Sequence, residues 1–193
     1  MAVFFQLSIT HILFYLITAL WILEFVIFPS KFKSDDFSES KSFKQILTMI
    51  IVTITLTVIL TWIDVLRLPE SAHQVFYVIG IIFYLLGLIL RYSGTYYLGQ
   101  YFTRDVAVSK DQELVFKGPY RKLRHPLYLG LFLLTVSVPL FFAQIGIFIL
   151  ATLLMGYVLN KRMTIEEANM EAILKDKYVT WKSTRYRFFP WLY

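Results

Sequence analysis

The sequence has 193 residues, of which 58% are hydrophobic, 18% aromatic and only 17% charged. Soluble domains usually contain about 25% charged residues, so this composition excludes an ordinary soluble domain and indicates a single lipid-embedded one. The net charge of +6 does not indicate nucleic-acid binding, because the Lys and Arg residues fall between apolar runs, as membrane topology requires. Cysteine is absent, which excludes a disulfide framework, a thiolate nucleophile and a Cys-ligated metal.

Three apolar stretches in residues 1–90 predict transmembrane helices. The first, 3–28, can cross a hydrocarbon core of roughly 30 Å, and a signal peptide is disfavoured because no Lys or Arg precedes the run. The second, 46–63, is rich in β-branched residues and would also suit a buried strand, but its length without a turn signal favours a helix. In the third, 75–90, Gly80 and Gly87 lie on one helix face and indicate close helix packing.

The second half of the chain alternates between polar and apolar segments. Residues 91–126 are polar, aromatic and basic, and we expect them to form a cytosolic, cofactor-binding segment. Residues 127–159 are apolar and too long for one ordinary span, so they predict a helical hairpin with its turn near 141–146. Residues 160–193 predict an amphipathic helix along the membrane surface. Its apolar face would carry Met170, Leu174, Tyr178 and Trp181.

The distribution of Lys and Arg predicts the orientation. They gather in a polar loop at 29–45, in the 91–126 segment and in the tail from residue 160, whereas the connector 64–74 has one and the hairpin turn none. Cytoplasmic loops carry the excess of Lys and Arg, so the polar segments should face the cytosol. The prediction is an all-α, multi-pass integral membrane protein, a single membrane domain over residues 1–193. It has about five transmembrane helices, a C-terminal helical hairpin and a cytosolic amphipathic helix.

The segment 117–130, KGPYRKLRHPLYLG, is the first candidate functional site. Pro126 biases His125 away from the α region, so Arg124 and His125 should lie on extended backbone at the membrane surface. Arg124 could instead be an anchor of the kind that cytoplasmic loops carry, with His125 a residue at a helix start. The Gly-Pro turn upstream and Pro126 bracket a shaped loop, which favours a site.

Glu167 and Arg187 are the further candidates. Glu167 completes a capping box with Thr164, which would be a sufficient structural role. It also falls on the apolar face of the predicted tail helix, where a carboxylate needs a partner such as a cationic or hydroxylated ligand. Glu166 and Glu171 are adjacent alternatives. Arg187 could be an interfacial snorkelling residue or could return a positive charge to the first cluster.

Several classes of chemistry lack their usual signals. The three histidines are too scattered for a metal site, so no metal is expected. G-x-S-x-G, G-x-G-x-x-G and a phosphate loop are absent from the sequence. Hydrolase, kinase and soluble nucleotide-fold functions are therefore disfavoured.

Three segments follow one another in the second half of the chain: GPYRKLRHPLYLG, the apolar hairpin, and EEANMEAILKDKYVTWKSTRYRFFP. In this order they resemble the isoprenylcysteine carboxyl methyltransferase family and its bacterial relatives, over roughly residues 90–190. The resemblance implies an O-methyltransferase that uses S-adenosylmethionine. The cofactor would enter from the cytosol, and a lipophilic or prenylated acceptor, most simply a carboxylate, from the bilayer. Leu174-Lys175 and Trp181 depart from the family pattern, where Phe-Gly and a second Tyr are common, and this leaves the acceptor open.

The resemblance also implies roles for individual residues. Arg124 and Arg187 match arginines expected near the acceptor and are the predicted catalytic residues. The predicted cofactor-binding residues are Val115, Lys117, Gly118, Tyr120, His125, Tyr128 and Glu167.

Two alternatives share part of this pattern. Integral-membrane sterol-type reductases, which use NADPH, also carry an Arg-His-Pro-x-Tyr-x-Gly segment and an Arg-x-x-Pro ending. The short chain and the Glu166-Glu167 pair favour the methyltransferase. A non-enzymatic membrane scaffold, in which the polar residues are anchors, is the second alternative.

Overall fold

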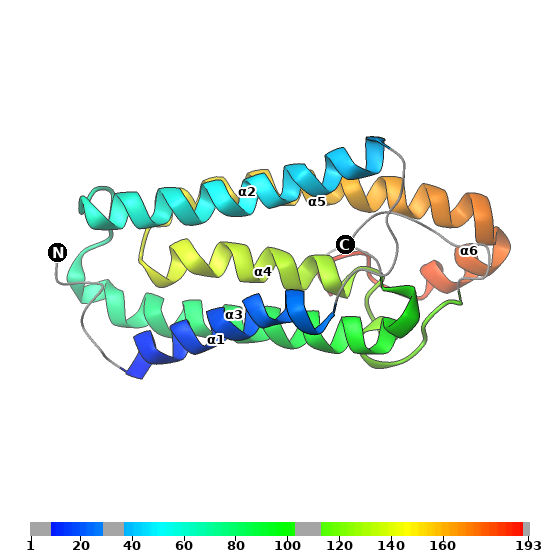
Figure 1. The fold of residues 1–193 in the computed structure, drawn as a ribbon, viewed down its shortest axis with the longest axis horizontal. Coiled ribbons are helices and arrows are strands. Elements are labelled where there is room, and N and C mark those ends of the chain that lie inside the picture. The colour runs from blue at the N-terminus through cyan, green and yellow to red at the C-terminus, as the bar shows by residue number, and fades with distance from the viewer. Residues whose placement is uncertain (1–8, 29–36, 103–112, 191–193) are drawn as a thin grey trace.

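The computed structural model of the protein describes residues 9–28, 37–102 and 113–190. Their main elements are six α-helices and two short 3-10 helices (Figure 1). In chain order these are α1 (Ile9–Ile27), α2 (Phe37–Trp62), α3 (Glu70–Leu98), η1 (Gly99–Tyr101), η2 (Gly118–Arg121), α4 (Pro126–Phe141), α5 (Ile145–Leu174) and α6 (Asp176–Ser183). The one β-bridge in the described part joins Leu123 to Tyr186.

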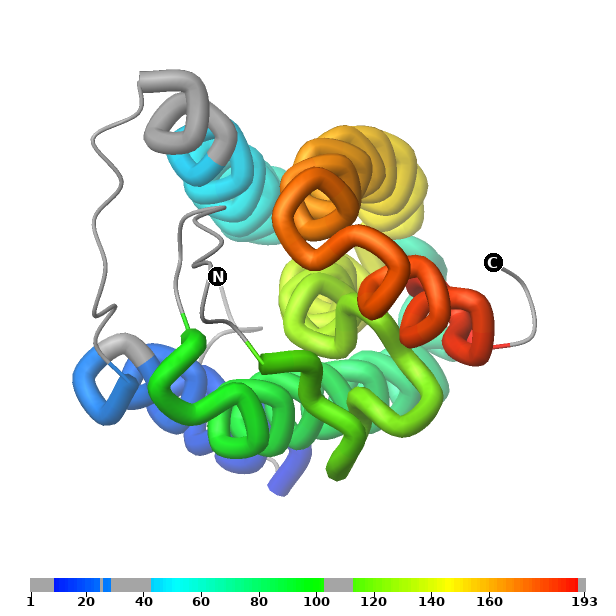
Figure 2. The backbone as a smooth tube through the Cα atoms, turned by 90° about the vertical axis from the view of Figure 1, so that its right-hand side faces the viewer, coloured from blue at the N-terminus to red at the C-terminus, as the bar shows by residue number. Residues whose placement is uncertain are grey.

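The five long helices form an elongated bundle. Seen along its axis, α2 and α5 lie on one side, α1 and α3 on the other, and α4 between them (Figure 2). Three helices are long and apolar enough to cross a membrane: Phe43–Trp62 in α2, Glu70–Tyr101 in α3 and η1, and α5. The stretch Ile9–Glu24 in α1 and the whole of α4 are shorter apolar helices. This all-α architecture agrees with the sequence prediction, although the number of membrane crossings stays a prediction.

Glycine brings α3 and α4 into backbone contact. A Cβ added at Gly87 would lie 2.8 Å from the carbonyl oxygen of Gly130, and one at Gly80 would lie 2.7 Å from the Cα of Phe141. Only glycine permits this distance, so the packing face predicted from Gly80 and Gly87 is confirmed. The close contact fixes α4, whose N-terminus carries the candidate site, against α3.

The predicted hairpin is present, but the helix that follows it is longer than expected. The turn falls at residues 142–144, and α5 then continues without a break to Leu174. The predicted capping box is therefore wrong: the Thr164 hydroxyl donates to the Asn160 carbonyl in mid-helix. The break comes instead at Lys175, which has a φ of 48°. The tail helix of the structure is α6.

Two other boundaries differ from the prediction. The polar loop 29–45 is shorter, because α2 begins at Phe37; residues 29–36 lie outside the described part. The third span does not end at residue 90, because α3 continues to Leu98. The segment 91–126 thus begins inside a helix of the bundle, and its first residue, Arg91, is buried.

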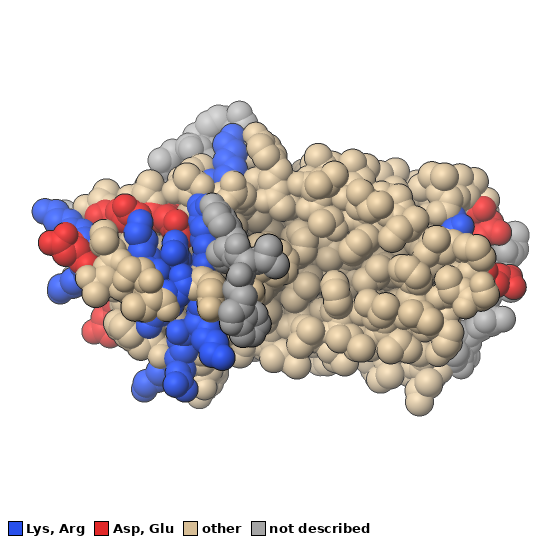
Figure 3. Space-filling view, turned by 180° about the vertical axis from the view of Figure 1, so that it is seen from behind, with Lys and Arg blue, Asp and Glu red and all other residues tan. Residues whose placement is uncertain are grey.

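Charge gathers at one end of the bundle. Lys and Arg side chains cover that end together with most of the acidic ones, while the middle of this face is free of charge among the described residues (Figure 3). This is the end at which η2, the start of α4 and α6 meet (Figures 1 and 2).

Candidate functional site

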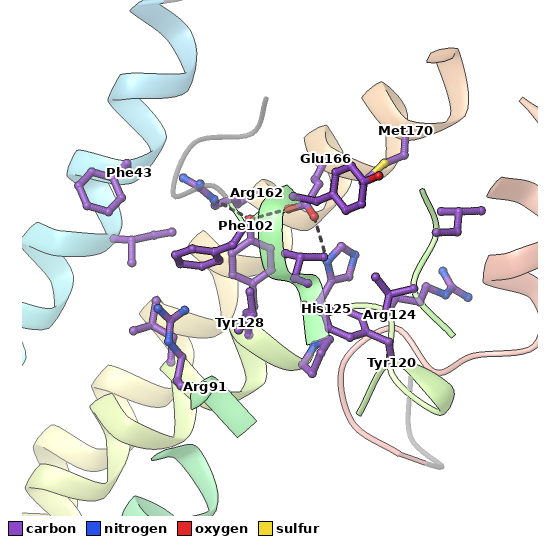
Figure 4. A pocket seen from close by; sticks show the side chains of 18 of the residues that line it. Phe43, Arg91, Phe102, Tyr120, Arg124, His125, Tyr128, Arg162, Glu166 and Met170 are labelled. Carbon is purple, nitrogen blue, oxygen red and sulfur yellow. Dashed lines mark hydrogen bonds and ion pairs between the residues drawn. The ribbon is translucent and has the colours of Figure 1, made fainter. Parts of the chain in front are cut away.

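A cavity of ≈ 140 Å³ lies at the charged end of the bundle. All the principal layers contribute to its wall: Phe43, Ile46, Leu47 and Ile50 come from α2, Arg91 and Leu98 from α3, Tyr128 and Leu131 from α4, Arg162, Glu166 and Met170 from α5, and Tyr178 and Trp181 from α6. Phe43, Arg91 and Phe102 lie at one side of the cavity, and His125, Glu166 and Met170 at the other (Figure 4). The wall is mainly apolar, with a few charged groups that converge, as is typical of a small-molecule site.

The Arg-His-Pro segment has the extended backbone that its proline predicts. His125 has φ −123° and ψ 59°, and Pro126 occupies the first turn of α4, where its missing N–H costs no hydrogen bond. The amide of Arg124 donates to the carbonyl of Tyr186 at 2.8 Å, and the amide of Tyr186 donates to that of Lys122 at 2.9 Å. The loop before α4 is therefore tied to the C-terminal segment.

Glu166 is the carboxylate that faces the cavity. One of its oxygens accepts a hydrogen bond from the Tyr128 hydroxyl, and the other lies 3.7 Å from Nδ1 of His125. The Tyr128 hydroxyl in turn accepts from Nε of Arg162 at 2.8 Å. These contacts fix Glu166 in place and leave it on the cavity wall (Figure 4).

Glu167 links three cationic or polar side chains behind that wall. Its Oε1 accepts from NH1 of Arg124 at 3.2 Å and from Nε2 of His125 at 3.1 Å. Its Oε2 lies 3.3 Å from Nε of Arg187, whose terminal nitrogens donate to Asn160 and Thr164. Glu167 thus joins α5 to both the loop before α4 and the C-terminal segment.

Aromatic side chains close the part of the cavity beside α6. Trp181 stacks on Tyr178 at 5.6 Å between ring centroids, and its indole N–H donates to the carbonyl of Val115 at 3.0 Å. Burial raises the pKa of the Tyr120 phenol, and burial together with the carboxylates of Glu167 and Glu166 raises that of Tyr178. Both phenols are consequently neutral at physiological pH, so neither supplies a phenolate base.

Gly118 shapes the loop rather than the wall. It has a φ of +56°, and a Cβ there would lie 2.1 Å from the Tyr97 ring. Only glycine suits both requirements, which explains the Gly-Pro turn that starts η2.

Arg185 ties the C-terminal segment to this loop. Burial lowers the pKa of Arg185, but the side chain stays a cation. It lies 4.6 Å from the Trp181 ring centroid and donates to the Tyr120 carbonyl.

The predicted site residues divide into two groups. Those that line the cavity are Val115, Tyr120, Arg124, His125 and Tyr128. Lys117, Gly118, Glu167 and Arg187 are not among the lining residues. The exposed Lys117 precedes η2, Gly118 begins it, and Glu167 and Arg187 belong to the network behind the wall.

Two arginines of the site and the contribution of α2 were not predicted from the sequence. Arg91 and Arg162 both line the cavity, although the sequence indicates only two positive charges outside the predicted spans. The signal available in the sequence was that each arginine lies at helical spacing from apolar residues, which indicates a place inside a helix of the bundle. The α2 residues carry no polar signal at all, so nothing in the sequence connects them with the site.

Comparison with known proteins finds relatives of one family. Residues 79–172 match the model of the isoprenylcysteine carboxyl methyltransferase (ICMT) family. A protein-S-isoprenylcysteine O-methyltransferase of Schizosaccharomyces pombe is 33% identical over 98 residues, which are 50% of this chain and 42% of that protein. Just under half of the chain is thus similar to the ICMT family.

A solved ICMT structure shares the fold. The eukaryotic intramembrane Ras methyltransferase ICMT superposes with a TM-score of 0.68 at 19% identity, covering 94% of this chain and 64% of that one. The chain thus spans less than two thirds of both relatives. The three helices that are long and apolar enough to cross a membrane support an integral membrane protein.

The ICMT-family match covers most of the site but not all of it. It includes Arg91, His125 and Glu166, whereas α1, α2 and α6 lie outside residues 79–172. No group of three or more His, Cys, Asp or Glu residues in the described part could hold a metal ion.

Proposed function

We propose that the protein transfers the methyl group of S-adenosylmethionine to the carboxylate of a lipophilic, prenylated acceptor, such as an isoprenylcysteine. The observation that carries the proposal is a fixed carboxylate, Glu166, facing a largely apolar cavity that arginines also line, in a chain whose residues 79–172 match the ICMT family. When bound, S-adenosylmethionine supplies an electrophilic methyl group on a sulfonium centre.

The residues of the cavity suit such a cofactor. Glu166 offers a negative charge for the cationic end of the molecule, and Tyr128 and His125 keep that carboxylate from turning away. Tyr120, Tyr178 and Trp181 offer apolar and aromatic surface for the adenosyl group. The cofactor-facing role predicted for Glu167 is therefore proposed for its neighbour Glu166.

The acceptor side is proposed at the α2 and α3 wall. Phe43, Ile46 and Leu47 of α2 offer apolar surface for a prenyl chain, and Arg91, Arg124 and Arg162 contribute positive charge for its carboxylate. A carboxylate is already ionised at neutral pH, so no general base is required. The arginines orient the carboxylate oxygen toward the methyl carbon, and the apolar wall excludes water from it.

The direct test is a transfer assay with labelled S-adenosylmethionine and N-acetyl-S-farnesylcysteine, using purified protein in detergent. We expect label in a lipophilic product that releases methanol in alkali, as a methyl ester does. A product stable to alkali would contradict a carboxylate acceptor, and no transfer to any prenylated carboxylate would contradict the proposed function.

The reaction should face the cytosol. The charge distribution supports this orientation, because the cavity lies at the end of the bundle where the Lys and Arg side chains gather.

A further inference from the structure

Glu24 of α1 is fully buried in the bundle, at 0% exposure. Its two carboxylate oxygens accept from Nε of Arg91, at 3.1 Å, and from the terminal nitrogen NH2 of the same guanidinium. Arg91 is 7% exposed and lies on α3. The pair is therefore a two-point ion pair inside a membrane bundle.

The pair leaves part of Arg91 available to a ligand. Among the described residues, the other terminal nitrogen, NH1, has no hydrogen-bond partner. Arg91 lines the cavity while Glu24 does not, and the Arg91 side chain extends from α3 toward the space near Phe43 and Tyr128 (Figure 4). The guanidinium thus has one edge held by Glu24 and another atom open to the cavity.

Helix docking alone does not explain the ion pair. The contact between α1 and α3 already includes a hydrogen bond between the hydroxyls of Thr18 and Tyr84, at 3.0 Å, and one from Tyr92 to the carbonyl of Leu20, at 2.7 Å. Burying two charges is costly, and apolar residues would usually hold two helices equally well. Ionisable residues at such depth usually serve a ligand.

We propose that Glu24 is a positioning residue that holds the Arg91 guanidinium so that NH1 faces the carboxylate of the lipophilic acceptor. A guanidinium held at one edge presents its remaining N–H donor in a defined direction. An arginine without such a partner does not, because its side chain has several rotatable bonds. This inference rests on the proposed function. It also gives α1, which lies outside the residues matched by the ICMT family, a part in acceptor recognition.

The test compares N-acetyl-S-farnesylcysteine with its carboxamide, which lacks the charge. Binding of each is measured by calorimetry to the full protein saturated with S-adenosylhomocysteine. We expect the wild type to prefer the acid, and Glu24→Gln to reduce that preference at least about tenfold, the loss expected when hydrogen bonds to a charged group are misdirected. The affinity for S-adenosylhomocysteine should stay within about twofold, because Glu24 does not line the cavity.

The control is Thr18→Val, which removes another polar contact between α1 and α3, made by two residues that do not line the cavity. It should lower thermal stability and keep the preference for the acid. Glu24→Asp retains the charge with a shorter reach and should give an intermediate loss, which provides a second measurement should Glu24→Gln fold poorly. In an Arg91→Lys background, Glu24→Gln should have little further effect on the preference for the acid, because the guanidinium that Glu24 holds is already absent.

Two results would overturn the inference: Glu24→Gln losing stability while keeping the preference, or a wild type that binds acid and carboxamide equally. Failure of the wild type to bind S-adenosylhomocysteine is a different result, and contradicts the proposed function itself.

Discussion

Glu166 and Glu167 are neighbours in sequence with separate surroundings. Adjacent residues on a helix point about 100° apart, so they meet different partners. Glu167 faces Arg124, Arg187 and Nε2 of His125, whereas Glu166 faces Tyr128, Nδ1 of His125 and the cavity. The sequence predicted Glu167 as the cofactor-facing carboxylate, with Glu166 as an alternative. Local sequence does not distinguish the two, because their partners come from segments 20 to 43 residues away.

Replacing Glu166 by Gln should separate binding from folding. Glu166→Gln removes the charge without changing the shape of the side chain. The affinity for S-adenosylhomocysteine, measured by calorimetry, should fall at least about tenfold, the usual scale for loss of a charge-assisted contact. Glu171→Gln is the matched control, because Glu171 pairs with Lys182 and does not line the cavity. Equal affinities for all three proteins would exclude Glu166 from the cofactor site.

Glu167→Gln should instead affect both properties. Three side chains lose a charged partner that ties α5 to the loop and the C-terminal segment, so the free energy of unfolding should fall by about 1–3 kcal/mol. Thermal unfolding in detergent and S-adenosylhomocysteine titration should both shift. Weakened binding at unchanged stability would show that Glu167 acts on the cofactor directly.

At the scale of the helices, the contact between α3 and α4 determines where the site sits. Gly87→Ala would place a Cβ 2.8 Å from the Gly130 carbonyl oxygen and 2.9 Å from the Leu134 amide nitrogen, so the two backbones must separate. We expect a loss of about 2 kcal/mol, as for other overpacked sites. Thermal unfolding would measure it.

Gly156→Ala is the control for that change. Gly156 lies on α5, and a Cβ there would meet nothing within 4 Å, so alanine should be neutral or stabilise by up to about 1 kcal/mol through helix propensity. If both variants unfold at the wild-type temperature, close packing at Gly87 is not important for stability.

The same scale shows what the sequence could predict. The apolar runs, the hairpin turn and the glycine face follow from local composition and periodicity, and the structure confirms them. The end of the third span was wrong, because Arg91 reads as a loop residue unless its buried partner Glu24 is known. The tail boundary was wrong because residues 160–174 are good helix formers, which continue α5 regardless of the membrane.

At the scale of the whole molecule, the orientation in the membrane is open to a direct measurement. The chain has no cysteine, so a single introduced thiol is the only one to label. Lys177→Cys lies on exposed α6 at the cavity end, and Asp64→Cys lies exposed at the opposite end, beyond α2. A membrane-impermeant thiol reagent added from the cytosolic side should label the first and not the second. The reverse pattern would place the cavity on the other side.

The central claim is that this bundle encloses an S-adenosylmethionine site. The most direct measurement titrates S-adenosylhomocysteine and NADPH separately into the purified protein in detergent and follows heat and thermal stability. The proposed function predicts that S-adenosylhomocysteine binds and stabilises the protein, that Glu166→Gln weakens this binding, and that NADPH has no effect. Binding of NADPH alone would support a reductase, and binding of neither ligand would contradict the site itself.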